Sequence, residues 1–187
     1  MRQLHALQGN GPGITERVQK YVAGRRFGVL MVGVSVFATW FGAETVMGAS
    51  GAVAEAVSRV WGYSSLLPHQ GEAMASVLEG RDSVVVLPTG GGKSLCYQLP
   101  AHILDGTCLV ISPLISLMKD QVDGAKANQV RAECLNSSLS GARIAEVTTL
   151  LRRGQLDLLY IAPERFTQES FLTLLDHIRP SLFTVDE

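Results

Sequence analysis

Residues 84–100 read VVVLPTGGGKSLCYQLP, and this stretch decides the fold class. An apolar strand leads into a glycine-rich turn and then a helix, which is the setting that a phosphate-binding loop requires. Glycines 90–92 let successive backbone N–H groups point at phosphate oxygens. Lys93 brings a positive charge to the β- and γ-phosphates, and the Ser94 hydroxyl suits Mg²⁺. The stretch predicts a nucleoside triphosphate site. Leu87 replaces the first glycine of the usual motif, and a glycine-rich turn with an incidental lysine is the alternative.

The chain from residue 57 onward alternates short apolar runs with amphipathic segments. The runs at 83–87, 107–112, 156–161 and 181–185 are typical of buried parallel strands. Apolar residues at helical spacing fall before and between them: Met74, Val77 and Leu78; Ile115, Met118 and Val122; Ile144, Val147 and Leu151; Phe171, Leu174, Leu175 and Ile178. This alternation predicts an α/β fold with a parallel sheet flanked by helices.

Two carboxylates, Asp186 and Glu187, follow the last predicted strand. In a nucleotide site, a carboxylate at the tip of a neighbouring strand holds Mg²⁺, and an adjacent glutamate orients and deprotonates the attacking water. We assign Asp186 the first role, together with Ser94 as a metal ligand, and Glu187 the second. Lys93, Asp186 and Glu187 are therefore the predicted catalytic residues.

Composition indicates a globular chain and leaves the partner open. The 187 residues are 47% hydrophobic and carry a formal net charge of −1, so contact with nucleic acid would come from local patches. Cys96, Cys108 and Cys134 are widely spaced and form no C-x-x-C pair, which favours reduced core thiols in a cytosolic chain over a metal site. The four histidines are scattered and predict no ligand set.

The segment FGVLMVGVSVFATWFGA at 27–43 contains no charged residue, and its composition is typical of a membrane helix. A spanning helix needs about 20 apolar residues, so the helix would continue past Glu44, an acid that is costly inside a bilayer. Lys20, Arg25 and Arg26 before the segment favour a cytoplasmic N-terminus. We predict a cytoplasmic chain with partial membrane association through residues 27–54; a buried helix of a soluble domain is the alternative.

This N-terminal part resembles one helix of the sodium:solute symporter family, through YVAGRR at 21–26 and VGVSVFATWFGAETVMGASGAVAE at 32–55. The resemblance implies a hydrophobic helix that is broken near its middle. Transport would need about a dozen such helices, so we expect none from this chain. The sequence is therefore divided into an apolar segment at 1–56 and an α/β part at 57–187.

Residues 61–187 resemble the first RecA-like domain of a RecQ-type DNA helicase. The motifs that carry the resemblance are WGYSSLLPHQ at 61–70, LPTGGGKSLCYQLPA at 87–101, LVISPLISLMKDQVD at 109–123 and FTVDE at 183–187, where the D-E-A-H box breaks off. The resemblance implies ATP and Mg²⁺ as cofactors. It implies nucleotide contacts from Tyr63, Gln70, Thr89, Gly90, Gly91, Gly92, Lys93 and Ser94, with Gln70 hydrogen-bonded to adenine. Ser112, Pro113, Leu114 and Lys119 would meet single-stranded DNA. The family usually has an arginine where this chain has Leu67, which predicts weaker adenine contacts.

The implied reaction is ATP hydrolysis that drives 3′ to 5′ movement along single-stranded DNA. In that family, arginines from a second RecA-like domain stabilise the transferred phosphoryl group, and the 187 residues contain no second domain. We therefore expect a helicase fragment that binds Mg·ATP and DNA and is inactive alone. Whether the chain hydrolyses ATP as an enzyme is left open. The alternatives are a nucleotide-binding module without turnover, a membrane-anchored fusion, and a symporter remnant without catalytic activity. No oligomeric state is predicted.

The resemblance also implies an incomplete sheet. In the family, the strand after the Asp-Glu motif inserts between the strand carrying that motif and the strand leading into the phosphate loop. Without it, unpaired backbone groups would face a slot, which predicts a loosely packed or aggregating fragment.

Some polar and aromatic residues have two interpretations. Tyr160 and Phe166 are expected to pack in the core or at a sheet edge rather than to stack on DNA bases, and Arg152 and Arg153 are expected on a solvated helix end. Arg165 is left open between a DNA contact and a structural role.

Overall fold

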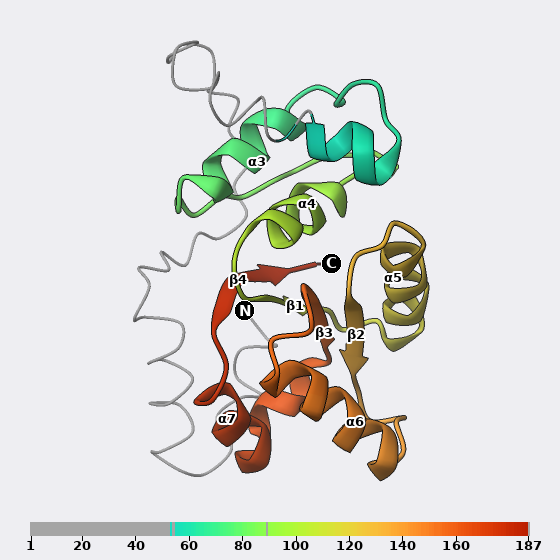
Figure 1. Cartoon of the computed structure of the whole chain (residues 1–187), viewed down its shortest axis with the longest axis vertical. Coiled ribbons are helices and arrows are strands. Elements are labelled where there is room, and N and C mark those ends of the chain that lie inside the picture. Colours follow the sequence, from blue (N-terminus) through green and yellow to red (C-terminus); the bar gives the residue numbers. More distant parts are fainter. Residues whose placement is uncertain (1–52, 54, 89, 187) are drawn as a thin grey trace. The chain divides into compact units, whose positions relative to one another are not determined.

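The computed structural model describes residues 53, 55–88 and 90–186 (Figure 1). The described residues fall into two compact units, one ending at Leu104 and one beginning at Asp105, and each is described by itself. The first contains the phosphate-loop sequence, and the second contains the sheet.

The sheet of the second unit has four parallel strands in the order β2-β3-β1-β4. They are β1 (Thr107–Ile111), β2 (Ala132–Leu135), β3 (Leu158–Ile161) and β4 (Pro180–Val185). Helices α5 (Ile115–Ala127), α6 (Gly141–Arg152) and α7 (Glu169–Leu175) connect them, and the short 3₁₀ helix η3 (Pro163–Thr167) precedes α7. The structure confirms the predicted α/β fold with a parallel sheet flanked by helices.

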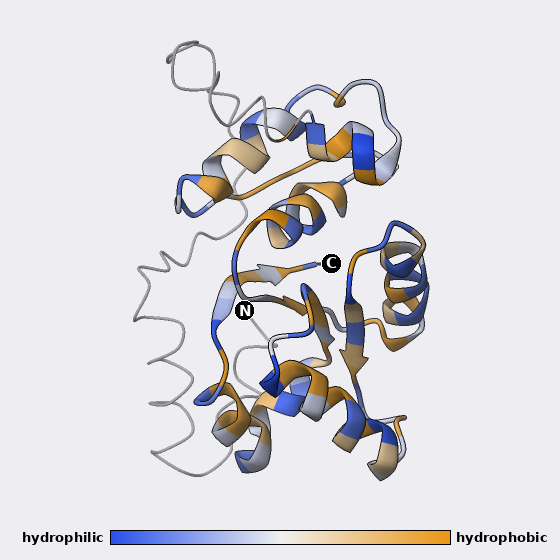
Figure 2. Ribbon diagram, in the orientation of Figure 1, coloured by the Kyte–Doolittle hydropathy of each residue, from blue (hydrophilic) through white to orange (hydrophobic). Residues whose placement is uncertain are grey.

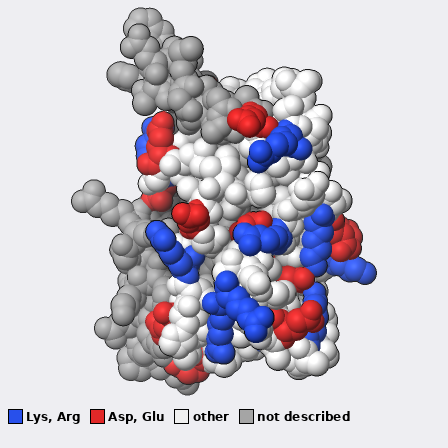
Figure 3. Space-filling view, viewed as in Figure 1, with Lys and Arg blue, Asp and Glu red and all other residues white. Residues whose placement is uncertain are grey.

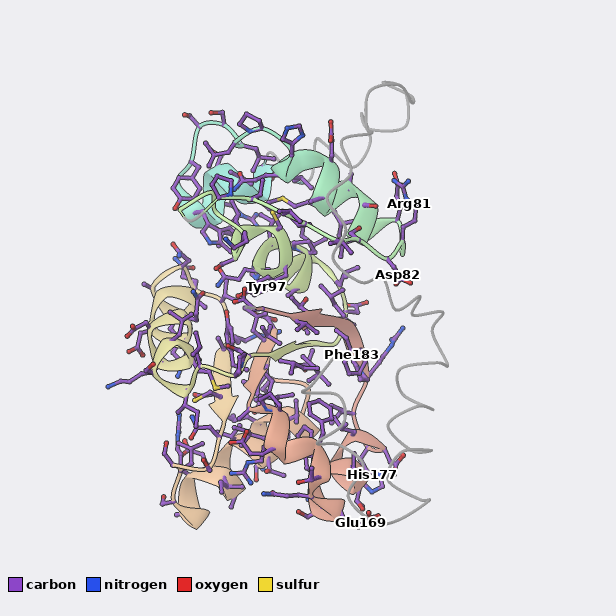
Figure 4. The ribbon with its side chains drawn as sticks, turned by 180° about the vertical axis from the view of Figure 1, so that it is seen from behind. Arg81, Asp82, Tyr97, Glu169, His177 and Phe183 are labelled. Carbon is purple, nitrogen blue, oxygen red and sulfur yellow. The ribbon has the colours of Figure 1, made fainter. Side chains whose placement is uncertain are left out.

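Helices α6 and α7 pack against one face of the sheet. The shared core combines Leu109, Leu135, Leu159 and Ile161 from the strands with Val147, Leu151, Phe171, Leu172, Leu174 and Leu175 from the helices. Phe166 of η3 packs at its margin, as does Phe183 of β4 (Figure 4). Tyr160 is fully buried, so it lies in the core, whereas Phe166 is only partly buried. Figure 2 shows the apolar strands and the mixed surfaces of the helices around them.

An ion-pair network joins edge strand β2 to two helices. Glu133, in the middle of β2, accepts a 2.7 Å hydrogen bond from Lys126 Nζ of α5 and another of 2.7 Å from Arg143 Nη2 of α6. The carboxylate is largely buried, so two cations compensate for its desolvation. The sequence analysis missed β2, because four residues with a glutamate in the middle give only a weak apolar signal.

The predicted strand at 83–87 is wrong, because these residues form no strand. Val84 and Val86 expose 66% and 83% of their surface. An extended segment becomes a strand only when a neighbour accepts and donates its backbone hydrogen bonds, and none among the described residues does so for 83–87. In the sheet itself, β4 pairs with β1 on one side and with no other described strand.

The first unit is a small helical assembly. The π-helix η2 (Val57–Trp61), α3 (Gln70–Leu78) and α4 (Leu95–Ile103) pack around Val53, Val57, Met74, Leu95 and Leu99. Every residue of α4 from Leu95 to Ala101 is buried, including Tyr97 (Figure 4). This buried helix fixes the position of the glycine-rich turn that precedes it.

The predicted hydrophobic helix, the symporter-like stretch at 21–55 and the membrane-associating segment at 27–54 lie outside the described residues, apart from Val53 and Glu55. Among the residues that the structure does describe, no helix combines the length and the apolar character needed to cross a membrane. The membrane association therefore stays a prediction that no observation supports.

All three cysteines are free thiols, and Cys96 and Cys108 are buried. Within the described ranges, no group of three or more metal-ligating side chains is present. Burial in the central strand raises the pKa of the Cys108 thiol to about 12, and a weak contact with the Thr184 hydroxyl opposes the rise. Cys134 is only half-buried, on edge strand β2.

We expect the Cys108 thiol to resist alkylation in the folded chain. Iodoacetamide attacks the thiolate, and a pKa of about 12 instead of 9.0 lowers the thiolate fraction at pH 9 by a factor on the order of 500. Timed alkylation at pH 9, read by peptide mass spectrometry, should label Cys134 long before Cys108 and both equally fast in urea. Equal rates in the folded chain would show that β1 is not buried as described.

Candidate nucleotide-binding site

The phosphate-loop sequence forms a tight turn directly before α4. The Gly91 N–H donates to the Pro88 carbonyl at 2.9 Å, and the Leu95 N–H donates to the Gly92 carbonyl at 3.2 Å as the helix begins. Ser94 occupies the N-cap position of α4. The loop therefore presents its glycine-rich backbone at the positive end of a buried helix. Thr89, a predicted nucleotide contact, lies outside the described residues.

Gln70, the first residue of α3, holds this loop through its side-chain amide. Its Nε2 donates to the carbonyls of Gly92 at 3.1 Å and Gly91 at 3.4 Å. Its Oε1 accepts from the Leu67 N–H at 2.8 Å. Gln70 is 2% exposed, so these bonds satisfy an amide that would otherwise be buried without partners. Sequence reasoning assigned Gln70 to adenine; that role is untested, and the loop contact is an additional one.

Gly92 is the position where a side chain cannot be accommodated. Its φ of +71° lies in the left-handed region, and a Cβ there would overlap Nε2 of Gln70. Glycine at this position lets the amide of α3 approach the loop closely.

The hydrogen-bond donors of the loop suit an anion. The Lys93 ammonium donates to the loop's own carbonyls, those of Leu87 at 3.1 Å and Pro88 at 3.4 Å. The backbone N–H groups of Gly92, Lys93 and Ser94 have no acceptor among the described residues. Three such donors, a neighbouring ammonium and a helix N-terminus fit the oxygens of a polyphosphate.

Most residues of the segment before Gln70 are exposed. Tyr63 and Leu67 expose 53% and 51% of their surface. Leu67 also lies beside Gly92, because its Cδ1 would be 3.9 Å from a Cβ built there. Tyr63 was a predicted nucleotide contact, and this role stays a prediction.

The remaining predicted site residues lie at the carboxyl edge of the parallel sheet. The Ser112 N–H, after β1, donates to the Ile161 carbonyl at 3.1 Å, and the Asp186 N–H, after β4, donates to the Ile111 carbonyl at 2.9 Å. Ligands of open parallel sheets bind along this edge. Asp186 and the predicted DNA loop thus share one edge.

The predicted DNA contacts lie in the connection after β1 and on the helix α5 that follows it. Ser112 is buried, whereas Pro113 and Leu114 are exposed in the connection to α5. Lys119 is exposed on the second turn of that helix. Figure 3 shows that basic and acidic side chains are interspersed over the visible face, in agreement with the near-zero net charge.

The predicted magnesium ligands belong to different units. Ser94 is in the unit that ends at Leu104, and Asp186 is in the unit that begins at Asp105. Glu187 lies outside the described residues. The pairing of Ser94 with Asp186, and the catalytic role of Glu187, therefore stay predictions.

Arg165 braces the loops at the carboxyl edge. Its Nη2 donates to the Asn136 carbonyl after β2, and its Nη1 donates to Gln168 Oε1 at 2.9 Å. The side chain of Asn136 accepts from the Ser138 N–H at 3.0 Å and from the Ser138 hydroxyl at 2.7 Å. Sequence reasoning missed this turn, although Asn-Ser-Ser is a turn signal. Arg165 was predicted either to contact DNA or to have a structural role, and these hydrogen bonds support the structural role.

The DEAD/DEAH box helicase family matches residues 67–187, which include the phosphate loop and the sheet. The chain belongs to this helicase family. The match begins after the segment at 21–55 that resembles a symporter helix, and that resemblance has no support.

Among its curated relatives, this helicase chain is similar to the ATP-dependent DNA helicase RecQ of Haemophilus influenzae. The two are 48% identical over 128 residues, which is 68% of this chain and 21% of the relative. The RecQ helicase of Bacillus subtilis is 43% identical over 132 residues, 70% of this chain and 22% of the relative. The ATP-dependent helicase SGS1 of Saccharomyces cerevisiae is 46% identical over 101 residues, 52% of this chain and 7% of the relative. The chain thus spans about a fifth of the length of the RecQ relatives.

We expect Gln70→Glu to destabilise the unit that contains the phosphate loop. A carboxylate can still accept from the Leu67 N–H, but it cannot donate to the two glycine carbonyls. The expected loss is about 1 to 3 kcal/mol in the free energy of unfolding. Urea unfolding would be followed through Trp61 in a Trp40→Phe background, with the exposed Gln155→Glu as the matched charge control. Equal unfolding curves for the two glutamate variants would show that the hydrogen bonds from Gln70 to the loop do not stabilise this unit.

Proposed function

We propose that residues 57–187 are the N-terminal part of the ATP-binding domain of a RecQ-type DNA helicase. The observation that carries this proposal is the glycine-rich loop at the start of α4, held by Gln70 and bearing N–H donors at Gly92, Lys93 and Ser94. The similarity to RecQ relatives supports ATP as the nucleotide and DNA as the partner. Movement along single-stranded DNA in the 3′ to 5′ direction is part of the same proposal.

Each predicted residue has a role in this proposal. The loop N–H groups and Lys93 hold the β- and γ-phosphates, for which Lys93 must leave the carbonyls of Leu87 and Pro88. Ser94 and Asp186 hold Mg²⁺, which neutralises charge that develops on the phosphates. Glu187 orients the attacking water and takes its proton.

DNA binding is assigned to the connection between β1 and α5. Pro113 and Leu114 are exposed there, and backbone groups at a strand end suit phosphate oxygens. Lys119 adds a cation one turn into the helix. Because Asp186 follows the neighbouring strand β4, a DNA contact at this loop would lie at the same sheet edge as the proposed metal ligand.

The 187-residue chain should bind Mg·ATP weakly and show no hydrolysis stimulated by single-stranded DNA. The arginines that complete the family's reaction come from a second RecA-like domain, and this chain spans about a fifth of the RecQ relatives. Fluorescence titration with a ribose-labelled ATP analogue would measure binding, and phosphate release would measure turnover. We expect Lys93→Ala to lose most of the affinity, whereas Arg153→Ala, at an exposed helix end, should retain it.

Two results would contradict the proposal in different ways. Affinity that Lys93→Ala leaves unchanged would show that the glycine-rich loop is not the phosphate site. Multiple turnovers stimulated by single-stranded DNA, and lost in Lys93→Ala, would show that the chain is an active enzyme without further domains.

A further inference from the structure

Two Asp-Gly dipeptides occur in the chain, at 105–106 and 123–124. An aspartate followed by glycine is especially susceptible to spontaneous isomerisation, because no Cβ hinders attack of the following backbone nitrogen on the side-chain carboxyl carbon. Both aspartates are exposed, so water reaches both. The two dipeptides differ in the backbone structure that surrounds them.

The dipeptide at 105–106 lies in the bend that precedes β1, outside any helix or strand. The Gly106 N–H has no backbone acceptor among the described residues, so no ladder holds this nitrogen away from the Asp105 carboxyl group. Gly106 has a φ of +114°, and a Cβ there would overlap the carbonyl oxygen of Arg179. The fold therefore requires glycine directly after Asp105.

The dipeptide at 123–124 lies inside α5. Within an α-helix, the Gly124 N–H donates to the carbonyl four residues earlier. The Gly124 carbonyl also accepts from Asn128 Nδ2 at 3.0 Å. These bonds keep the peptide group between Asp123 and Gly124 aligned with the helix, where its nitrogen cannot turn toward the carboxyl carbon. Helix α5 should therefore protect this dipeptide.

We propose that Asp105 is a site of spontaneous isoaspartate formation. The Gly106 nitrogen bonds to Cγ of Asp105, and the hydroxyl of the carboxylic acid leaves with the amide proton as water. Water then adds to the α-carbonyl carbon of the cyclic imide and breaks its bond to the Gly106 nitrogen. The chain now runs through Cγ, with the α-carboxylate as the side group. The water lost in the first step returns in the second, and no electrons are transferred.

The product has one additional backbone atom directly before the buried strand β1. Thr107, the first residue of that strand, donates its N–H to the Arg179 carbonyl at 3.1 Å and its hydroxyl to the Leu156 carbonyl at 2.8 Å. These two bonds fix the start of the strand, so the bend has to accommodate the additional atom. Isomerisation at Asp105 thus alters the connection between α4 and β1.

Peptide mapping of the full chain after prolonged incubation near neutral pH tests the proposal. Electron-transfer dissociation distinguishes isoaspartate from aspartate in each peptide. In the folded chain, we expect at least roughly tenfold more isoaspartate at Asp105 than at Asp123, because only Asp123 is followed by an amide of a helical ladder. In urea, the two sites should react at similar rates. An amount at Asp105 no greater than at Asp123 in the folded chain would overturn the proposal.

Two further comparisons separate the effect of glycine from exposure alone. Asp82 is also exposed and outside any helix or strand, but Ser83 after it has a Cβ, so Asp82 should form less isoaspartate than Asp105. Asp105→Glu keeps the charge but would need a six-membered ring, which closes far more slowly. This variant should show no isomerisation at position 105 and unchanged amounts at Asp82 and Asp123. Equal amounts at Asp82 and Asp105 in the unmodified sequence would contradict the role of Gly106.

Discussion

The side-chain amide of Gln70 connects the start of α3 to the glycine-rich loop, and the geometry of the loop depends on it. Its two hydrogens go to the carbonyls of Gly91 and Gly92, so these carbonyls are held by α3 while the following N–H groups stay without described partners. Gly92 allows the close approach because it has no Cβ.

The parallel sheet positions the proposed metal ligand Asp186 and the proposed DNA-binding loop. Parallel pairing of β1 with β3 and β4 brings the chain after each of these strands to one edge. Asp186 and the loop from Ser112 to Leu114 therefore lie along the same edge without any direct contact being required. Arg165 stabilises a neighbouring part of that edge by binding the Asn136 carbonyl.

Much of this architecture could be predicted from the sequence. The apolar runs that contain β1 and β3 are mostly buried, and the run that contains β4 is partly buried up to the exposed Val185. The glycine-rich motif marked the loop before α4. The failures have physical causes. Residues 83–87 have the composition of a strand, but composition does not supply a pairing partner. In β2, Glu133 is neutralised by two cations distant in sequence, which no local pattern shows.

The hydrogen bonds from Gln70 to the loop could not be predicted either. They join residues 21 and 22 positions apart in sequence, and the Gln70 side chain was predicted to contact adenine instead.

The binding of triphosphate by the loop backbone is the central claim of this account. Hydrogen–deuterium exchange of the full chain, with and without Mg·ATP, measures those amides directly. The account predicts slower exchange at Gly92, Lys93 and Ser94 on addition of Mg·ATP, and no change in the Lys93→Ala variant. Unchanged exchange at these three amides under saturating nucleotide would contradict it.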